Sequence, residues 1–410
     1  MLSRRQLLVG VGVTGTTGAA AAVSSAPLAS ERDDGRYDWP MARYDPAGTG
    51  HNPDAAGPKD GAEVAWQQDT ESPMHGLTAP ILLGETLYGV GRQSLVAFDR
   101  ESGEIRFARD GQYWSTPARA SAKAYRSNTL AVSSREGVHG LNAGGGYELF
   151  GRSIGTERWH APGEESRRWS GSAPREPSPV TADGTVYAID PGSDRVVAVD
   201  ASSGRLEWER TIGDPRSSGT NRPVVSEGTV YVSSRPGDLV ALDADTGERR
   251  WSERPDPHAN SGLNYRNFRP PTITDDGLLV PDREGVALFD PADGTLRWEY
   301  VHDGNATDGS AAVADGTAFV TDGEESLHAI DLESGEREWT ADYRPDVEPV
   351  VADGVVYLGY RYAELVAIDA DTGERRFAYD DSVYFAQPIV GDGVVYVLTD
   401  EGLLALEEAS

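Results

Sequence analysis

Short runs of alternating apolar and polar residues follow one another along most of the chain and are separated by tight turns. In one stretch the run Leu239–Asp243 leads through a turn at Gly247 to a second run that contains Trp251. The same order recurs seven times: an apolar run, Asp or Asn, Gly four residues later, and an aromatic residue four after that. The Asp or Asn stands at positions 99, 142, 200, 243, 290, 331 and 369. Alternation with a period of two predicts β-strands, so each copy predicts a strand, a turn and a strand.

A second shared pattern precedes most of these copies. A proline leads two or three apolar residues, an Asp-Gly or Glu-Gly pair follows, and an alternating run with a tyrosine completes the pattern, as in Pro223 to Tyr231. Such a pair between β-branched and aromatic residues predicts a hairpin. Each unit therefore has four strands, which we name A to D in chain order. Successive turn positions are 38 to 58 residues apart, a spacing typical of propeller blades.

The two ends of the repeat region complement each other. An eighth unit begins at Pro388, but the chain ends before its aromatic D strand, and the run Ala62–Trp66 near the N-terminus has no unit of its own. If the run Ala62–Trp66 pairs with the eighth unit, two exposed strand edges that would favour aggregation are covered. We therefore predict an all-β fold: an eight-bladed β-propeller of four-stranded blades over residues 62–410, its last blade closed by an N-terminal strand. Residues 30–61, rich in Pro, Gly and Asp, are expected to pack on this body as an extended segment.

The first 29 residues carry a different signal. Arg4 and Arg5 precede Leu7 and Leu8 and a weakly apolar, Gly- and Ala-rich stretch. This resembles a twin-arginine signal, which directs folded proteins to export. We therefore expect an extracytoplasmic protein, secreted or associated with the cell surface or membrane, and a monomer. Asn305 begins the one glycosylation sequon, Asn-Ala-Thr.

The charge balance limits the partners. Asp and Glu number 67 against 37 Lys and Arg, and only two of the basic residues are lysines. This composition is of the haloarchaeal type, in which a carboxylate shell keeps a protein soluble in molar salt. A net charge of −30 argues against nucleic acid as a partner. The chain has no cysteine, and its seven histidines show no metal-ligand spacing, so we predict neither a metal site nor catalytic residues.

The run from Ala241 to Trp251 and its copy from Ala367 to Phe377 resemble the repeat of the pyrroloquinoline-quinone (PQQ) propeller superfamily. The resemblance extends over nearly all of residues 62–406. It implies the architecture and two functional alternatives. One is a non-catalytic binding scaffold of the BamB-like kind, which needs no cofactor. The other is a quinoprotein dehydrogenase of alcohols or sugars that uses PQQ with Ca²⁺. We favour the scaffold, because the calcium ligands of the dehydrogenases cannot be assigned to residues of this chain.

Residues that interrupt the repeat are the candidate binding residues. The B–C turns and D–A connections share one face of a propeller, and variable loops on a rigid scaffold commonly bind partners. Two long connections, 151–177 and 253–271, combine arginines with aromatic residues, which suits anionic ligands and acidic protein surfaces. Thr116, Ser178, Arg222, Arg269, Glu348 and Gln387 precede A strands and are expected to line the central channel. The candidates for an unknown protein partner or a small anionic ligand are Arg168, Trp169, Arg222, Tyr265, Arg266, Arg269, Glu348 and Gln387.

Overall fold

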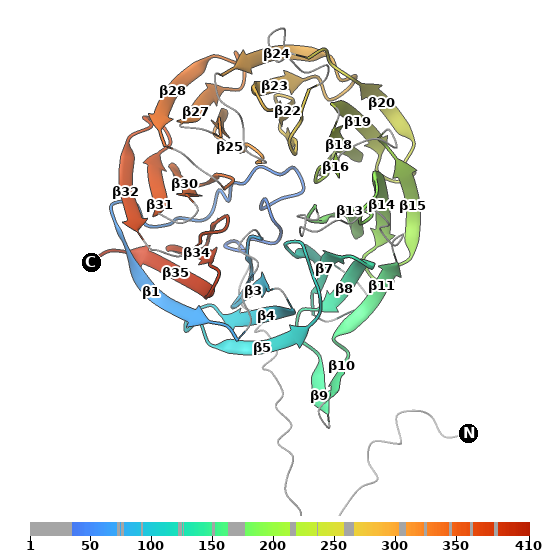
Figure 1. The fold of residues 1–410 in the computed structure, drawn as a ribbon, viewed down its shortest axis with the longest axis vertical. Coiled ribbons are helices and arrows are strands. Elements are labelled where there is room, and N and C mark those ends of the chain that lie inside the picture. Colours follow the sequence, from blue (N-terminus) through green and yellow to red (C-terminus); the bar gives the residue numbers. More distant parts are fainter. Residues whose placement is uncertain are drawn as a thin grey trace, which may run out of the picture.

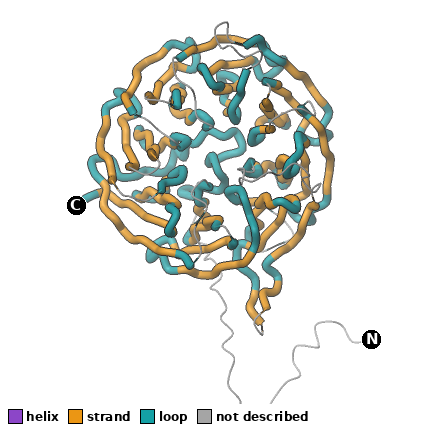
Figure 2. Tube along the Cα trace, in the orientation of Figure 1, coloured by secondary structure: helices purple, strands orange, loops and turns teal. Residues whose placement is uncertain are grey.

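Eight antiparallel sheets stand around a central axis in the computed structural model, which confirms the predicted eight-bladed propeller (Figure 1). The structure describes residues 35–71, 74, 78–91, 93–121, 125, 127–149, 152–162, 177–213, 219–235, 237–257, 266–302, 309–323, 326–343, 347–360, 364–380 and 384–410. Strand and loop account for the whole of this part of the chain (Figure 2), and it includes no helix long and apolar enough to cross a membrane.

The strands of each blade follow one another from the axis to the rim. Blade 1 contains β2 (Ile81–Leu83), β3 (Thr86–Val90), β4 (Ser94–Asp99) and β5 (Ile105–Asp110), and blade 2 contains β6 (Ala118–Ala120), β7 (Thr129–Ser134), β8 (Gly137–Asn142) and β11 (Glu157–Pro162). Blade 3 contains β12 (Val180–Ala182), β13 (Thr185–Ile189), β14 (Arg195–Asp200) and β15 (Leu206–Thr211), and blade 4 contains β17 (Val224–Ser226), β18 (Thr229–Arg235), β19 (Asp238–Asp243) and β20 (Arg249–Glu253), with the short β16 (Gly219–Thr220) beside β18.

The second half of the ring repeats this order. Blade 5 contains β21 (Thr272–Ile273), β22 (Leu278–Pro281), β23 (Gly285–Phe289) and β24 (Leu296–Val301), and blade 6 contains β25 (Ala312–Ala314), β26 (Thr317–Thr321), β27 (Ser326–Asp331) and β28 (Arg337–Asp342). Blade 7 contains β29 (Val350–Ala352), β30 (Val355–Tyr360), β31 (Glu364–Asp369) and β32 (Arg375–Asp380), and blade 8 contains β33 (Ile389–Val390), β34 (Val394–Leu398), β35 (Gly402–Glu408) and the N-terminal β1 (Ala62–Asp69). The prediction that an N-terminal strand closes the last blade is confirmed.

The tight turns of the repeat form as their residues dictate. At the A–B turns Asp183, Glu227, Asp315 and Asp353 adopt φ angles between 45° and 49°, each followed by a glycine. Two successive residues with positive φ match the right-handed twist of a hairpin. At the C–D turns the repeated Asp accepts bonds from its own turn. Asp243 Oδ1 accepts from the Thr246 N–H at 3.0 Å and from the Thr246 hydroxyl at 2.9 Å. These acids therefore cap the turns that the repeat predicts.

The repeated tryptophan joins one blade to the next. The Trp208 ring lies against Gly247, where a Cβ atom would be 2.6 Å from the ring, and its Nε1–H donates to the Ala244 carbonyl at 2.8 Å. A side chain on that glycine would displace the ring, so the turn glycine and the tryptophan form one contact across the blade boundary. The same contact closes the ring between blades 8 and 1, where Trp66 lies on Gly103.

Blade 2 departs from the predicted assignment. The sequence places its D-strand aromatic at Phe150, but β8 pairs with β11, and Trp159 stands opposite Gly140. Phe150 itself lies outside the described residues. An added hairpin of β9 (Tyr147–Leu149) and β10 (Arg152–Ile154) is inserted between the C and D strands. Near the insertion, Gly146 and Phe150 stand at the spacing of the repeat. The sequence pattern therefore predicted the wrong D strand for this blade.

Residues 35–61, which we call the strap, run through the central channel (Figure 1). The strap begins beside the blade 1 A–B turn, where Asp38 accepts a bond from the Gly84 N–H, and ends beside that of blade 7, where Lys59 pairs with Asp353. In between, its backbone bonds to inner strands or A–B turns of seven blades, at Leu82, Arg119, Val225, Ile273, Val313, Val351 and Gly393. Both strap ends thus lie on the face of the A–B and C–D turns, the turn face. The B–C turns and D–A connections form the opposite, loop face.

Candidate functional site

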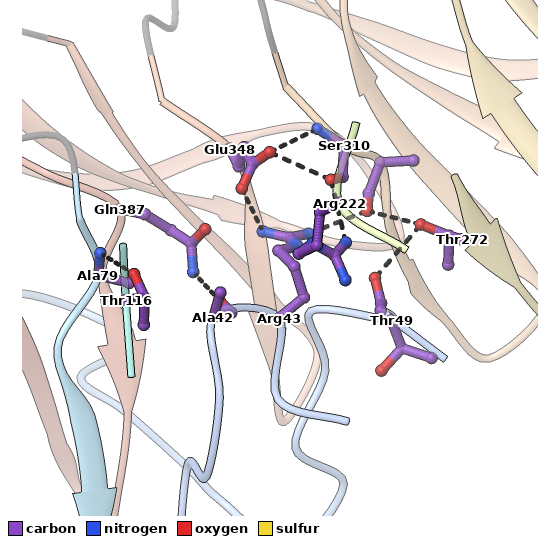
Figure 3. A network of polar contacts seen from close by, with 12 residues as sticks. Ala42, Arg43, Thr49, Ala79, Thr116, Arg222, Thr272, Ser310, Glu348 and Gln387 are labelled. Carbon is purple, nitrogen blue, oxygen red and sulfur yellow. Dashed lines mark hydrogen bonds and ion pairs between the residues drawn. The ribbon is translucent and has the colours of Figure 1, made fainter. Parts of the chain in front are cut away.

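The residues that precede the A strands gather near the axis, on the loop-face side of the strap (Figure 3). Neighbouring positions are linked: the Thr116 hydroxyl accepts a bond from the Ala79 N–H at 3.0 Å, and the Thr116 N–H donates to Ser178 Oγ at 3.2 Å. Further round the ring, Gln387 Nε2 donates to the Ala42 carbonyl of the strap at 2.6 Å. Three of the predicted binding residues, Arg222, Glu348 and Gln387, therefore belong to one polar layer, which we call the axial cluster (Figure 3), and Arg269 is buried at the corresponding position before β21.

Arg222 is buried in this cluster, and no carboxylate of the described residues lies within ion-pair distance of its guanidinium. Its Nη2 donates to Ser310 Oγ at 3.3 Å and its Nη1 to the Pro223 carbonyl at 3.4 Å, both long bonds to neutral acceptors. Burial lowers the pKa of Arg222 to about 10; Glu348 raises the pKa and the positive charge of Arg43 lowers it. The guanidinium is still protonated at neutral pH.

Arg43 is a member of the cluster that the sequence did not indicate. It comes from the strap and is fully buried, and its Nη2 donates to the Ala311 carbonyl at 2.9 Å. Its Nη1 lies 3.9 Å from Glu348 Oε2, and within the part of the chain that the structure describes its Nε and Nη1 have no hydrogen-bond partner. Burial lowers the pKa of Arg43, and the carboxylates of Glu348 and Asp45 oppose that shift. A single arginine in a segment without periodicity carries no signal, so sequence reasoning missed it.

Glu348 connects the cluster to blade 6. Its Oε1 accepts from the Ser310 N–H at 2.8 Å and from the Ser310 hydroxyl at 3.1 Å. The Glu348 side chain keeps 21 % of its surface exposed, whereas Arg43 and Arg222 are covered. The carboxylate is thus the exposed part of this group, and the two guanidiniums lie beneath it.

The remaining described candidate, Arg266, is engaged elsewhere. Its Nη1 pairs with Asp282 Oδ2 at 3.0 Å, and its Nη2 contacts both carboxylate oxygens of Glu299 at 2.9 and 3.0 Å. Its Nε donates to the Asp256 carbonyl at 2.9 Å. This buried ion network ties β22 and β24 to the connection that leads into blade 5. In this arrangement all three guanidinium nitrogens of Arg266 are bonded within the protein, so the residue stabilises the scaffold.

Several predicted positions lie outside the described residues. They are Arg168, Trp169, Tyr265, the sequon Asn305, and the export arginines Arg4 and Arg5. Their roles remain predictions from the sequence.

A chain of hydrogen bonds on blade 2 has the residue types of a nucleophilic triad. Ser134 Oγ lies 2.7 Å from His139 Nε2, and His139 Nδ1 lies 3.1 Å from Glu157 Oε2. Ser134 is only 5 % exposed, however, and its Oγ accepts a bond from the Glu136 N–H at 3.0 Å. The hydroxyl therefore caps the B–C turn and is not presented to a substrate.

A groove of about 580 Å³ lies on the turn face between the strap and blades 3 and 4. Its walls include Tyr44 of the strap and Tyr187 of blade 3, and exposed carboxylates of Asp183, Glu227 and Asp245 surround it. It is separate from the axial cluster, which lies on the other side of the strap.

The ring of eight blades, the Trp–Gly contact between blades and the polar axial layer define a PQQ-like β-propeller. A family model described as outer membrane protein assembly factor BamB matches residues 149–379 and 323–410. The chain belongs to this family.

Relatives of two kinds share the repeat. Outer membrane protein assembly factor BamB of Yersinia pestis is 31% identical over 127 residues, which cover 31% of this chain and 27% of that protein. Quinohemoprotein alcohol dehydrogenase ADH-IIG of Pseudomonas putida is 31% identical over 140 residues, covering 30% of this chain and 19% of that protein. The matches thus span less than a third of the length of these curated relatives.

Solved structures of both kinds share the fold. Quinohemoprotein alcohol dehydrogenase from Comamonas testosteroni superimposes with a TM-score of 0.70 at 16% identity, over 95% of this chain and 84% of that one. BamB from Moraxella catarrhalis gives a TM-score of 0.63 at 15% identity, over 83% of this chain and 98% of that one. At such identities the likeness concerns the fold alone.

Proposed function

We propose that the protein is an exported, non-catalytic binding scaffold that recognises a protein partner or a small anionic ligand on its loop face. Export, by the twin-arginine route, is part of the proposal. The one assembly function named among the relatives is that of BamB, and we extend only its general character, a propeller that binds, to this chain.

The observation that carries the proposal is the asymmetry of the channel. The strap blocks the axis from the turn face by backbone bonds to seven blades, so the axial cluster can be approached from the loop face. Arg222 and Arg43 concentrate positive charge there in a chain whose net charge is −30. Cations held in a partly dewatered layer attract carboxylates and phosphates more strongly than exposed ones do.

A quinoprotein dehydrogenase is the second candidate, favoured by the identity to quinohemoprotein alcohol dehydrogenase. Its cofactor would require Ca²⁺, which takes six to eight oxygen ligands at about 2.3–2.6 Å. Among the described residues, no group of three or more His, Cys, Asp or Glu side chains could hold a metal ion. In the axial cluster, Glu348 stands beside two arginines, which disfavours a cation. The described residues therefore do not fit the calcium-quinone pair.

Two measurements test the proposal. The first is incorporation of a photo-crosslinking amino acid at Glu136 in a loop-face B–C turn, with Asp245 in a turn-face C–D turn as the matched control. Both positions are exposed. A defined protein crosslinked from Glu136 and not from Asp245 supports the scaffold, and equal or absent crosslinking from both argues against a protein partner on the loop face.

The second measurement concerns ligands and the dehydrogenase alternative. The purified protein is mixed with PQQ and Ca²⁺ and assayed for a bound-cofactor spectrum and for dye reduction with alcohols or sugars. A cofactor spectrum with turnover would overturn the scaffold proposal. In parallel, an Arg222→Met/Arg269→Met double variant is expected to lose binding of citrate or phosphate measured by calorimetry, and binding that persists would exclude the axial cluster as the ligand site.

A further inference from the structure

The axial cluster contains more buried positive charge than its side chains neutralise. Within the described part of the chain, Glu348 is the one carboxylate that pairs with Arg43, at 3.9 Å, and Arg222 contacts only the neutral oxygens of Ser310 and Pro223. The two arginines are neighbours, because they bond to the consecutive residues Ser310 and Ala311 (Figure 3). One carboxylate therefore faces two guanidiniums.

Asp45 of the strap does not supply the missing charge at contact distance. Its Oδ1 accepts from the Gly48 N–H at 2.6 Å and from the Thr49 N–H at 3.0 Å, and its Oδ2 accepts from the Thr49 hydroxyl at 2.7 Å. These bonds turn the strap and leave the carboxylate outside ion-pair reach of both arginines. Asp45 therefore acts on Arg43 and Arg222 only at longer range.

An uncompensated buried cation is costly, and proteins commonly lose the charge or bind a counter-ion. Losing the charge is excluded for Arg222 at neutral pH, because its pKa stays at about 10. The Nη1 and Nε atoms of the fully buried Arg43 also have no hydrogen-bond partner among the described residues. Both observations indicate an anion that accepts from these donors.

The packing restricts the size of that anion. A Cβ atom at Gly50 would lie 2.2 Å from Arg43 Nη2, and one at Gly48 would lie 2.9 Å from Arg222 Nη2. The strap backbone thus presses directly on both guanidiniums, and the carboxylate of Glu348 covers Arg43 from another side. On the strap side of the two guanidiniums, room is therefore left only for a small ion, and a ligand with several non-hydrogen atoms would have to bind from the loop face.

We propose that a single halide ion, chloride in salt solution, binds between Arg43 and Arg222 and locks the strap to the ring. Arg43 belongs to the strap and Arg222 to the residues that precede β17, so an ion shared by both joins two segments that are distant in the sequence. The inference rests on the axial cluster used in the proposed function and assigns to it a tightly held inorganic ion.

The test is thermal and urea unfolding of the full chain during a chloride titration at constant ionic strength, with gluconate, which is too large for the site, as the replacement anion. A site of this kind makes the folded-to-unfolded ratio rise about tenfold for each tenfold rise in chloride above its Kd. Arg222→Met is expected to abolish this response. Glu348→Gln is expected to tighten chloride binding several-fold, because it removes the competing carboxylate. Arg250→Met, which breaks an exposed ion pair with Asp243, is the matched control and should retain the response.

A second measurement does not depend on the variants folding. Crystals grown in bromide should give an anomalous peak between the Arg43 and Arg222 guanidiniums, and the absence of a peak there would overturn the inference. An identical chloride dependence in the wild type and Arg222→Met would also overturn it. Crosslinking from Glu136 reports the partner independently, so failure of the halide site and failure of the proposed function are distinguishable.

Discussion

Ring closure through Trp66 can be tested by substitution. Trp66 lies in the N-terminal β1, packs on Gly103 of blade 1, and donates its Nε1–H to the Arg100 carbonyl at 3.1 Å. Trp208 makes the equivalent contact between blades 3 and 4. Trp208 joins two blades that follow each other in the sequence, whereas Trp66 lies in an N-terminal strand that completes the C-terminal blade. Trp208 therefore serves as the internal reference.

The expected losses follow from the contacts. Trp66→Phe keeps most of the ring packing but removes the indole N–H, so it should cost about 1 kcal/mol. Trp66→Ala also opens a cavity. Removing a fully buried tryptophan side chain lowers the free energy of unfolding by about 3–5 kcal/mol. Because Trp66 is only partly buried, its loss should be near about 3 kcal/mol. Trp208→Ala, at a site only 8% exposed, should lie near 4 kcal/mol. For a ring of this size the melting temperature should fall by about 1 °C for each kcal/mol.

Urea unfolding gives the free energies, and hydrogen exchange read by mass spectrometry locates the effect. Trp66→Ala should raise exchange in β35, whose outer neighbour is β1, before it does so in blades 3 and 4. Trp208→Ala should show the reverse order. Unchanged stability together with unchanged exchange in β35 after Trp66→Ala would refute closure of the ring by this strand.

Three further predictions concern the strap, the ion network and the turn acids. Gly50→Ala should destabilise the protein by about 1–3 kcal/mol and speed proteolysis of the strap, because the residue has a φ of 64° and its Cβ would contact Arg43. Arg266→Met should cost about 3–5 kcal/mol in urea unfolding, since it removes the charged partner that Arg266 provides to the buried Asp282. Hydrogen bonds from the arginine on the neighbouring strand and from the turn hold the pKa of Asp243 to about 2. Its contribution is present above the unfolded-state pKa, near 3.9, and is lost as the pH falls toward about 2, so Asp243→Asn should flatten stability measured across that range.

The architecture was predictable because its determinants are local and repeated. An Asp-Gly or Glu-Gly pair between two alternating runs favours a hairpin, and the Asp, Gly and Trp spacing determines the C–D turn and the contact to the next blade. Seven copies allowed these local rules to be checked against each other. Blade 2 shows the limit: an inserted hairpin mimicked the spacing, and only strand pairing showed that Trp159 and not Phe150 faces Gly140.

The site was predictable only in part, because its members are brought together by the ring and not by local rules. Position before an A strand was enough to place Arg222, Glu348 and Gln387 near the axis. Sequence position could not distinguish Arg269 from Arg266, which lies three residues earlier. Arg266 forms ion pairs with Asp282 and Glu299. Partners on neighbouring strands decide whether an arginine is available, and one sequence does not reveal them.

The strap changes how the axial cluster is understood. Without it, the channel of an eight-bladed ring would be open at both ends, and Arg222 would face solvent. The strap supplies Arg43, excludes water from the layer and adds a second positive charge close to the first. Since like charges in a poorly solvated layer repel each other strongly, a further negative charge beside Glu348 in the same layer would stabilise this arrangement. The strap, which the sequence indicates only as an extended segment, therefore determines how much negative charge the site needs.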